Sequence, residues 1–309
     1  MSLIPAGSSP LLELSRGHQS AVLACKFLNS GNTAVSSGLD AHLSVWDLQN
    51  LRHYEIEHLF RQNPAITALT TLDGPLLVAG ASNSQIALVD LETGQKLRNY
   101  TGHTRAVNQI YSISKDKFVS VGDDGSAKLW DTHQKKPVWE VATEFPLFTA
   151  VAPAHNHTMY TSGLDPTITA YDIRQSPNHE LFNLESQHVD SVTSIDITLG
   201  LKMCSFGFDN EIHIQDAKQS PTRESRNLGI IDASFDDNAN KFLIRNQFIN
   251  DDQHIICGNS LFDVTSKQRV VDFTAELDKQ VSVIDNNYDR DSKKVIMSAD
   301  NGSLYVYQM

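Results

Sequence analysis

A two-residue motif, Trp-Asp, recurs along this chain of 309 residues at a nearly constant interval. Each copy of the motif ends one repeat unit of the chain. The first and third units end in strict Trp-Asp copies, and the others end in weakened copies. The second residues of the copies are Asp47, Asp90, Asp131, Asp172, Asp216, Asp263 and Gln308. Successive copies lie 41 to 47 residues apart, close to the period of a four-stranded repeat unit. The chain is therefore predicted to fold as a series of similar small sheets.

A second marker keeps the same phase. Gly17-His18 and Gly102-His103 precede the motif in units one and three, and Gln187-His188 holds this place in unit five. Each His lies 28 or 29 residues before the closing Asp of its unit. Two markers locked at one period indicate true internal repeats. We expect seven units that make one domain over residues 1–309.

Each unit reads as β structure. An apolar run begins three residues after each His, for example 21–28, and both of its alternating faces are largely apolar. Such a strand is covered on both sides. A second strand, a Gly/Asp-rich turn and a third strand ending at the motif follow, as in 121–131. This pattern predicts an all-β fold, a seven-bladed β-propeller, and excludes helical solenoids.

The two ends of the chain complement each other. Unit seven stops after its third strand (303–308), while residues 10–16 precede the first Gly-His and have no unit of their own. We expect residues 10–16 to supply the missing outer strand of blade seven. This N-terminal strand would close the ring and leave few exposed edges.

The repeated His, Ser or Thr, Asp and Trp positions could be mistaken for a catalytic site. They recur at the blade period, whereas a hydrolase needs one exposed set with an oxyanion hole. We expect a structural network in which His donates to Asp and accepts from Ser, and Trp N–H extends the chain. Its members are His18, Ser36, Asp40 and Trp46; His103, Ser120, Asp124 and Trp130; Thr161 and Asp165; and His188, Ser205 and Asp209.

Composition removes several function classes. The formal net charge of −12 disfavours sequence-independent binding to nucleic acid. Cys25, Cys204 and Cys257 lie in apolar runs and are expected to be buried thiols of an intracellular protein. No stretch predicts a membrane helix or a signal peptide. No phosphate loop, zinc helix or CxxC pair occurs, and the isolated His155 and His157 lack companion ligands. We expect no cofactor, no metal, no membrane and no small-molecule substrate.

These residues resemble the WD-repeat (WD40) family over essentially the whole chain. The resemblance implies a seven-bladed propeller that acts as a protein-interaction platform without catalysis. The stretches 17–27, 92–111, 123–131, 171–175 and 187–197, and the extended segment between units five and six, also resemble the WD-repeat subunit of the U5 small nuclear ribonucleoprotein. That narrower resemblance implies a nuclear pre-mRNA splicing factor, docked on the large U5 scaffold protein and the U5 GTPase. Unit six departs from the pattern in its shortened turn (257–263), and unit seven has no Gly-His.

Two segments are candidate partner sites. The long connection after Asp216 contains Lys218, Arg223 and Arg226, a basic spot on an acidic chain. This connection either contacts a partner or is a solvated loop. The partner would be a protein or, secondarily, the backbone of an RNA.

The other segment is Tyr171-Asp172-Ile173-Arg174, which resembles the WDxR box of propellers that serve as substrate receptors of cullin–RING ubiquitin ligases. Arg174 either marks such a receptor or pairs with a nearby carboxylate. A third alternative, an enzyme that uses the central channel, is disfavoured because the inner-strand starts supply mostly Ala, Val and Ser.

Overall fold

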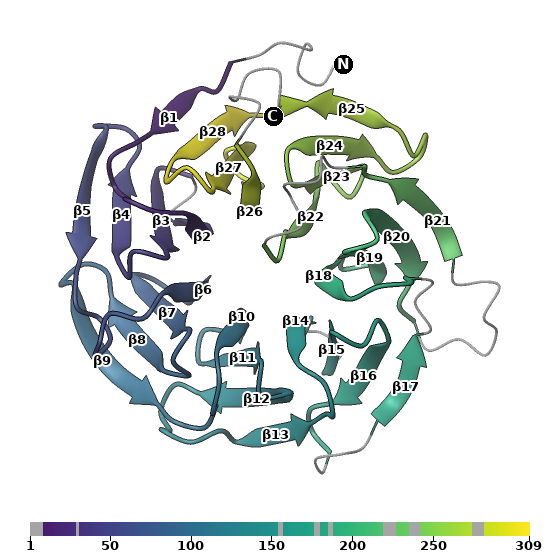
Figure 1. Cartoon of the computed structure of the whole chain (residues 1–309), viewed down its shortest axis with the longest axis horizontal. Helices are drawn as coiled ribbons and strands as arrows, with labels where there is room; N and C mark the ends of the chain where they lie inside the picture. Colours follow the sequence, from purple (N-terminus) through teal and green to yellow (C-terminus); the bar gives the residue numbers. More distant parts are fainter. Residues whose placement is uncertain are drawn as a thin grey trace.

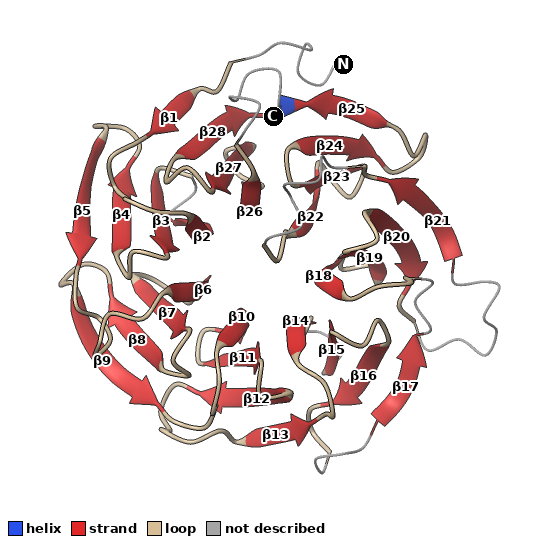
Figure 2. Ribbon diagram, in the orientation of Figure 1, coloured by secondary structure: helices blue, strands red, loops and turns tan. Residues whose placement is uncertain are grey.

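The computed structural model describes residues 9–28, 31–153, 157–175, 180–184, 188–218, 227–234, 242–273 and 281–309. These residues contain 28 β-strands, arranged in seven four-stranded antiparallel sheets, and a short helical turn follows β25 (Arg269–Asp272). The sheets stand around a central axis like the blades of a propeller (Figure 1), and turns and loops connect them (Figure 2). The expected all-β, seven-bladed fold is confirmed. The described part of the chain contains no helix long and apolar enough to cross a membrane.

Every blade runs outward from the axis in the same order. The innermost strands are β2 (Val22–Leu28), β6 (Ile66–Thr71), β10 (Val107–Ser114), β14 (Leu147–Val151), β18 (Val192–Ile197), β22 (Asn246–Ile249) and β26 (Val283–Asp289). The second strands are β3 (Thr33–Gly38), β7 (Leu76–Ala81), β11 (Lys117–Gly122), β15 (Thr158–Gly163), β19 (Lys202–Gly207), β23 (His254–Cys257) and β27 (Lys294–Ala299).

The third strands end at the residues that close the motif copies. They are β4 (Leu43–Asp47), β8 (Ile86–Asp90), β12 (Ser126–Asp131), β16 (Ile168–Asp172), β20 (Glu211–Asp216), β24 (Ser260–Asp263) and β28 (Leu304–Gln308). The outer strands are β5 (Arg52–Ile56), β9 (Gln95–Tyr100), β13 (Trp139–Ala142), β17 (Glu180–Leu184), β21 (Asn227–Asp232), β25 (Arg269–Asp272) and, in blade seven, β1 (Leu12–Leu14).

Blade seven is completed by both ends of the described chain. β1 pairs antiparallel with β28, and Leu12 lies opposite Val306. The side chain of Leu14 is buried in a cluster that contains Trp46 of blade one and Ile296 of blade seven. The N-terminal strand therefore closes the last blade, as predicted, and its apolar side chain helps to bind blade seven to blade one.

The core lies between the blades. Leu28 and Val45 of blade one share one buried cluster with Leu69 and Val89 of blade two. Strands covered on both faces explain why the inner runs are apolar on both alternating positions. The three cysteines are free and buried, as expected, and burial raises the pKa of the Cys25 thiol. These thiols behave as small apolar side chains.

The channel-facing edge of the inner strands is capped by the neighbouring blade. A polar side chain on one inner strand accepts a hydrogen bond from a backbone N–H of the next inner strand, with donor–acceptor distances of 2.7–3.2 Å. The pairs, acceptor first, are Asp285–Cys25, Asn287–Phe27, Thr70–Ser112, Gln109–Ala150, Thr149–Ile195, Ser194–Asn246, Asp196–Phe248 and Gln247–Tyr288. These contacts satisfy edge donors that would otherwise depend on water.

Candidate functional site

The His, Ser, Asp and Trp positions meet in blades one and three. In blade three, His103 Nδ1 lies 2.9 Å from Asp124 Oδ2, and His103 Nε2 lies 2.7 Å from Ser120 Oγ. The indole N–H of Trp130 donates to the same Ser120 oxygen at 2.8 Å. Blade one repeats this geometry with His18, Ser36, Asp40 and Trp46. Both histidine side chains are fully buried, so the sets lie in the interior.

The glycine before each histidine has a steric reason. A Cβ atom on Gly17 would lie 2.3 Å from the indole ring of Trp46. Only glycine therefore lets the chain pass this close to the ring, which links the Gly-His marker to the Trp-Asp marker.

The aspartates of these networks titrate abnormally. Burial alone would raise the pKa of Asp124, but the hydrogen bonds from His103 and Ser126 outweigh it and hold the pKa well below its usual range. The pKa of Asp40 and that of Asp209 are lowered in the same way, against burial, by hydrogen bonds from His18 and His188. The carboxylates are thus ionised partners that orient the rings.

Blade five keeps part of the network. His188 contacts Asp209 at 2.9 Å and Ser205 at 2.9 Å, but Gln215 replaces the tryptophan. The ring of His213 stacks on His188, with centroids 3.7 Å apart and planes 7° apart. Burial, followed by repulsion from His188, lowers the pKa of His213.

His188, Asp209 and His213 bring three potential metal-ligand atoms together. An imidazole nitrogen binds a metal in the plane of its own ring at about 2.0–2.1 Å. Two parallel rings stacked 3.7 Å apart cannot both direct a lone pair at one ion. The ring geometry does not fit a metal centre. Of the isolated pair His155 and His157, the first lies outside the described residues.

Blade four lacks the histidine of the network. Asp165 is exposed and accepts a hydrogen bond from the backbone N–H of Thr167 at 2.8 Å. Thr161 is buried and contacts the hydroxyl of Tyr171. The structure therefore places Thr161 and Asp165 at the expected positions, but with no ring between them.

Arg174 pairs with the aspartate of its own box. Its guanidinium donates to Asp172 at 3.0 and 2.8 Å, and Gln175 donates to the same carboxylate. The hydrogen bonds from Arg174 hold the pKa of Asp172 well below its usual range. The Arg174 side chain is still 63% exposed, so the paired guanidinium remains on the blade surface.

The basic segment after Asp216 is described only at its start. Lys218 is exposed, and its ammonium lies 3.8 Å from Asp216. Arg223 and Arg226 lie outside the described residues.

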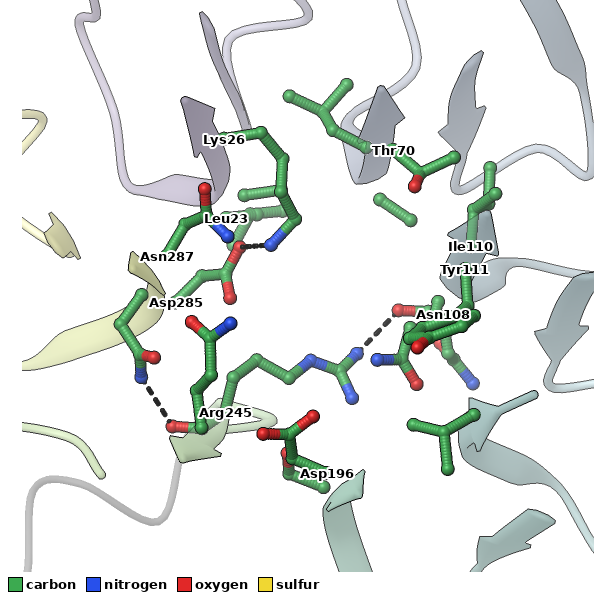
Figure 3. Close-up of a pocket in the computed structure, with 18 of the residues that line it drawn as sticks. Leu23, Lys26, Thr70, Asn108, Ile110, Tyr111, Asp196, Arg245, Asp285 and Asn287 are labelled. Atoms are coloured by element: carbon green, nitrogen blue, oxygen red, sulfur yellow. Dashed lines mark hydrogen bonds and ion pairs between the residues drawn. The ribbon is translucent and has the colours of Figure 1, made fainter. Parts of the chain in front are cut away.

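The central channel holds charged groups that the sequence analysis did not anticipate. Arg245, just before β22, crosses the channel, and its guanidinium donates to the backbone carbonyl of Asn108 at 2.6 Å (Figure 3). It also donates to the carbonyls of Phe148 and Thr193 at 3.1 and 2.7 Å. One side chain thus joins blade six to blades three, four and five. Burial lowers the pKa of Arg245 to about 10.

Two carboxylates share this channel. Asp285 accepts from the Lys26 ammonium at 3.4 Å (Figure 3). Burial raises the pKa of Asp196 to about 6 although Asp196 accepts a backbone hydrogen bond from Phe248. These charged residues lie within or beside the inner strands rather than at their starts, which were the positions expected to supply mainly Ala, Val and Ser. Polar residues in otherwise apolar inner runs were the available signal.

Comparison with known proteins adds to this geometry. Residues 8–47 and 94–131 match the family model described as "WD domain, G-beta repeat". These two regions of the chain are therefore WD repeats. The matched residues contain the two strict units. One match begins just before β1 and ends with β4, and the other begins just before β9 and ends with β12. Each match runs from the outer strand of one blade to the third strand of the following blade. The sequence repeat is therefore offset by one strand from the blade.

Several curated relatives of this WD-repeat chain are splicing factors. It is 30% identical to pre-mRNA-splicing factor cwf17 of Schizosaccharomyces pombe over 58% of this chain and 52% of that protein. It is 27% identical to the U5 small nuclear ribonucleoprotein 40 kDa protein of Mus musculus over 62% of this chain and 52% of that protein. The chain thus spans about half the length of these two relatives. The F-box/WD repeat-containing protein sel-10 of Caenorhabditis elegans is 24% identical over 40% of this chain and 21% of that protein.

A solved structure supports the fold of the WD-repeat chain. A chain in the crystal structure of the mitotic checkpoint complex superimposes with a TM-score of 0.81 at 14% identity, over all of this chain and 95% of that one. At this identity, the likeness concerns architecture alone.

Proposed function

We propose that this WD-repeat chain is a non-catalytic scaffold subunit of a U5-type small nuclear ribonucleoprotein that acts in pre-mRNA splicing in the nucleus. The observation that carries the proposal is the similarity to cwf17 and to the U5 40 kDa protein over more than half of this chain. A ring whose neighbouring inner strands are joined by hydrogen bonds offers broad faces for docking. Its partners would be large proteins, the U5 scaffold protein and the U5 GTPase.

Direct RNA contact is a secondary part of this proposal. The net charge of −12 disfavours association with the phosphate backbone of RNA. The segment that holds Lys218, Arg223 and Arg226 is a candidate local contact. If it binds a partner, the double change Arg223→Glu and Arg226→Glu weakens association with the native complex in a pull-down. Unaltered association would remove this segment from the interface.

The test is affinity purification of the tagged full chain from nuclear extract at low and moderate salt. We expect U5 RNA and splicing proteins to co-purify, and digestion of the RNA before purification should leave the protein partners attached. Absence of U5 RNA and splicing proteins at low salt would overturn the proposal.

A second candidate, a substrate receptor of a cullin–RING ubiquitin ligase, draws on the exposed Arg174 side chain and on the similarity to sel-10. If it were correct, a ligase adaptor would co-purify and Arg174→Ala would abolish its recovery. The splicing proposal instead expects Arg174→Ala to leave the recovered partners unchanged.

A further inference from the structure

Blade four contains a pocket where blades one, three and five hold a buried histidine. Leu147 pairs with Gly163 as Val107 pairs with Gly122 in blade three, so Thr143 corresponds to His103 when counted back from the inner strand, although the connection from the preceding outer strand is one residue shorter in blade four. The Thr143 hydroxyl donates to the carbonyls of Gly125 and Phe145, both at 2.8 Å. The side chain thus turns toward the preceding blade and leaves the histidine position empty.

The resulting pocket has a volume of about 540 Å³. Its lining includes Thr161, Asp165 and Tyr171, which correspond to the Ser, Asp and Trp of the complete networks. In blade three, Asp124 accepts from His103 Nδ1 and from the backbone N–H of Thr104. Among the described residues, the Asp165 carboxylate accepts a hydrogen bond only from the backbone N–H of Thr167 in its own turn, and it is exposed.

We propose that this blade-four pocket binds an arginine side chain of a partner protein. The inference rests on the proposed scaffold function and names one chemistry by which a partner is recognised. Three sister sites in the same chain show that a carboxylate and a hydroxyl at these positions hold a planar nitrogen donor. A guanidinium has the same planarity, and it can donate two parallel hydrogen bonds to Asp165.

Charge and shape favour arginine over a neutral group. Glu144 and Glu180 join Asp165 in the lining, and no Lys or Arg is part of it. The ring of Tyr171 forms a buried wall, and Phe145, 43% exposed, lies at the rim. Aromatic faces attract guanidinium groups, and an acidic molecule steers cationic partners toward its surface. A basic peptide segment with one anchoring arginine fits these features.

The test uses full-length protein with ¹³C-labelled Ile, Leu and Val methyl groups and follows Val141 and Leu147, which line the pocket. The probe is a capped Gly-Gly-Arg-Gly-Gly peptide, and the same peptide with citrulline, which is neutral and nearly isosteric, is the control. We expect saturable shifts with arginine, and binding weaker by at least about tenfold with citrulline or in Asp165→Asn.

Two further variants sharpen the result. Asp73→Asn removes an exposed charge outside the pocket lining and should leave the dissociation constant unchanged. Thr143→His should refill the pocket from within and abolish binding; if this variant does not fold, Asp165→Asn still decides.

Equal shifts with both peptides, no shifts up to about 10 mM peptide, or unchanged binding in Asp165→Asn would overturn the pocket proposal. The purification from nuclear extract reports on the whole surface. The scaffold proposal can therefore succeed where the arginine pocket fails, and each failure is recognisable separately.

Discussion

His18, His103 and His188 each lie between a carboxylate and a serine hydroxyl, and this placement depends on single residues. Position 143 shows how local the choice is, because a threonine there turns away and leaves a pocket of about 540 Å³. The sequence predicted the network partners in blades one, three and five. It did not predict the empty site in blade four, because the cavity depends on where the Thr143 side chain turns.

Asp124→Ala should destabilise the protein by about 1–3 kcal/mol, because the buried His103 N–H loses its carboxylate acceptor and keeps only the more distant Ser126 hydroxyl. The measurement is a urea unfolding curve. Asp165→Ala, at the same position in blade four, removes only an exposed turn contact. It should change the free energy of unfolding by no more than about 0.5 kcal/mol. Equal effects of the two changes would contradict the network.

His213 should make the protein less stable in mild acid. Its pKa is lowered in the folded state by burial and by repulsion from His188, so below about pH 6.5 the unfolded chain binds a proton that the folded chain resists. The free energy of unfolding should therefore fall as the pH is lowered below about 6.5. His213→Phe keeps a flat ring without titration, and urea curves at pH 7.5 and 5.5 should show a smaller loss for it.

Asp196 changes the stability of the protein with pH in the direction opposite to His213. Burial raises its pKa to about 6, so the folded state holds that proton more tightly, and stability from this group falls as pH rises through 6. Because Asp196 is present in both proteins, the difference between wild type and His213→Phe isolates the histidine. A variant with the same pH dependence as wild type would contradict the stacked-pair explanation.

At the scale of elements, the most consequential strand is also one of the shortest. β1 contributes three residues, yet it completes blade seven and buries Leu14 against Trp46. Its position followed from the sequence, because unit seven lacked a strand and residues 10–16 lacked a unit. The apolar contact across the blade boundary did not, since it depends on how the two sheets pack.

Deletion of residues 1–16 should lower the thermal midpoint or make the protein insoluble, because it exposes the edge of β28. Leu14→Ala should destabilise by about 2 kcal/mol, whereas Leu11→Ala, at a side chain 54% exposed, should have little effect. Differential scanning calorimetry measures all three. A truncation that melts like wild type would contradict closure by β1.

At the scale of the whole molecule, the blades are joined by side chains that cap the free edge of the next inner strand. The junction between blades one and two differs, because Ala24 and Lys26 hold the capping positions and neither accepts a hydrogen bond. There the apolar cluster of Leu28 and Leu69 and the bond from Ser37 Oγ to the Ile66 carbonyl join the blades. The ring is continuous but not uniformly bonded.

Asp285→Ala should destabilise the ring by about 1–3 kcal/mol, because the buried N–H of Cys25 loses its acceptor at 3.0 Å. Asp285→Asn keeps an acceptor oxygen and should cost less. Urea unfolding measures both. If the asparagine variant were as unstable as the alanine variant, the charge paired with Lys26, and not the cap, would be the stabilising feature.

The sequence by itself determined the number of blades, their strand order and the closing strand, because a fixed period and alternating burial are properties of local chain segments. It also predicted the partners in the complete histidine networks, since the His, Ser, Asp and Trp positions repeat at the blade period. Only the tertiary structure decided what fills the channel and what stays empty in blade four. Arg245 meets carbonyls from three other blades, and the pocket exists because one side chain faces its neighbour. Such contacts join residues far apart in the chain, and no local pattern specifies them.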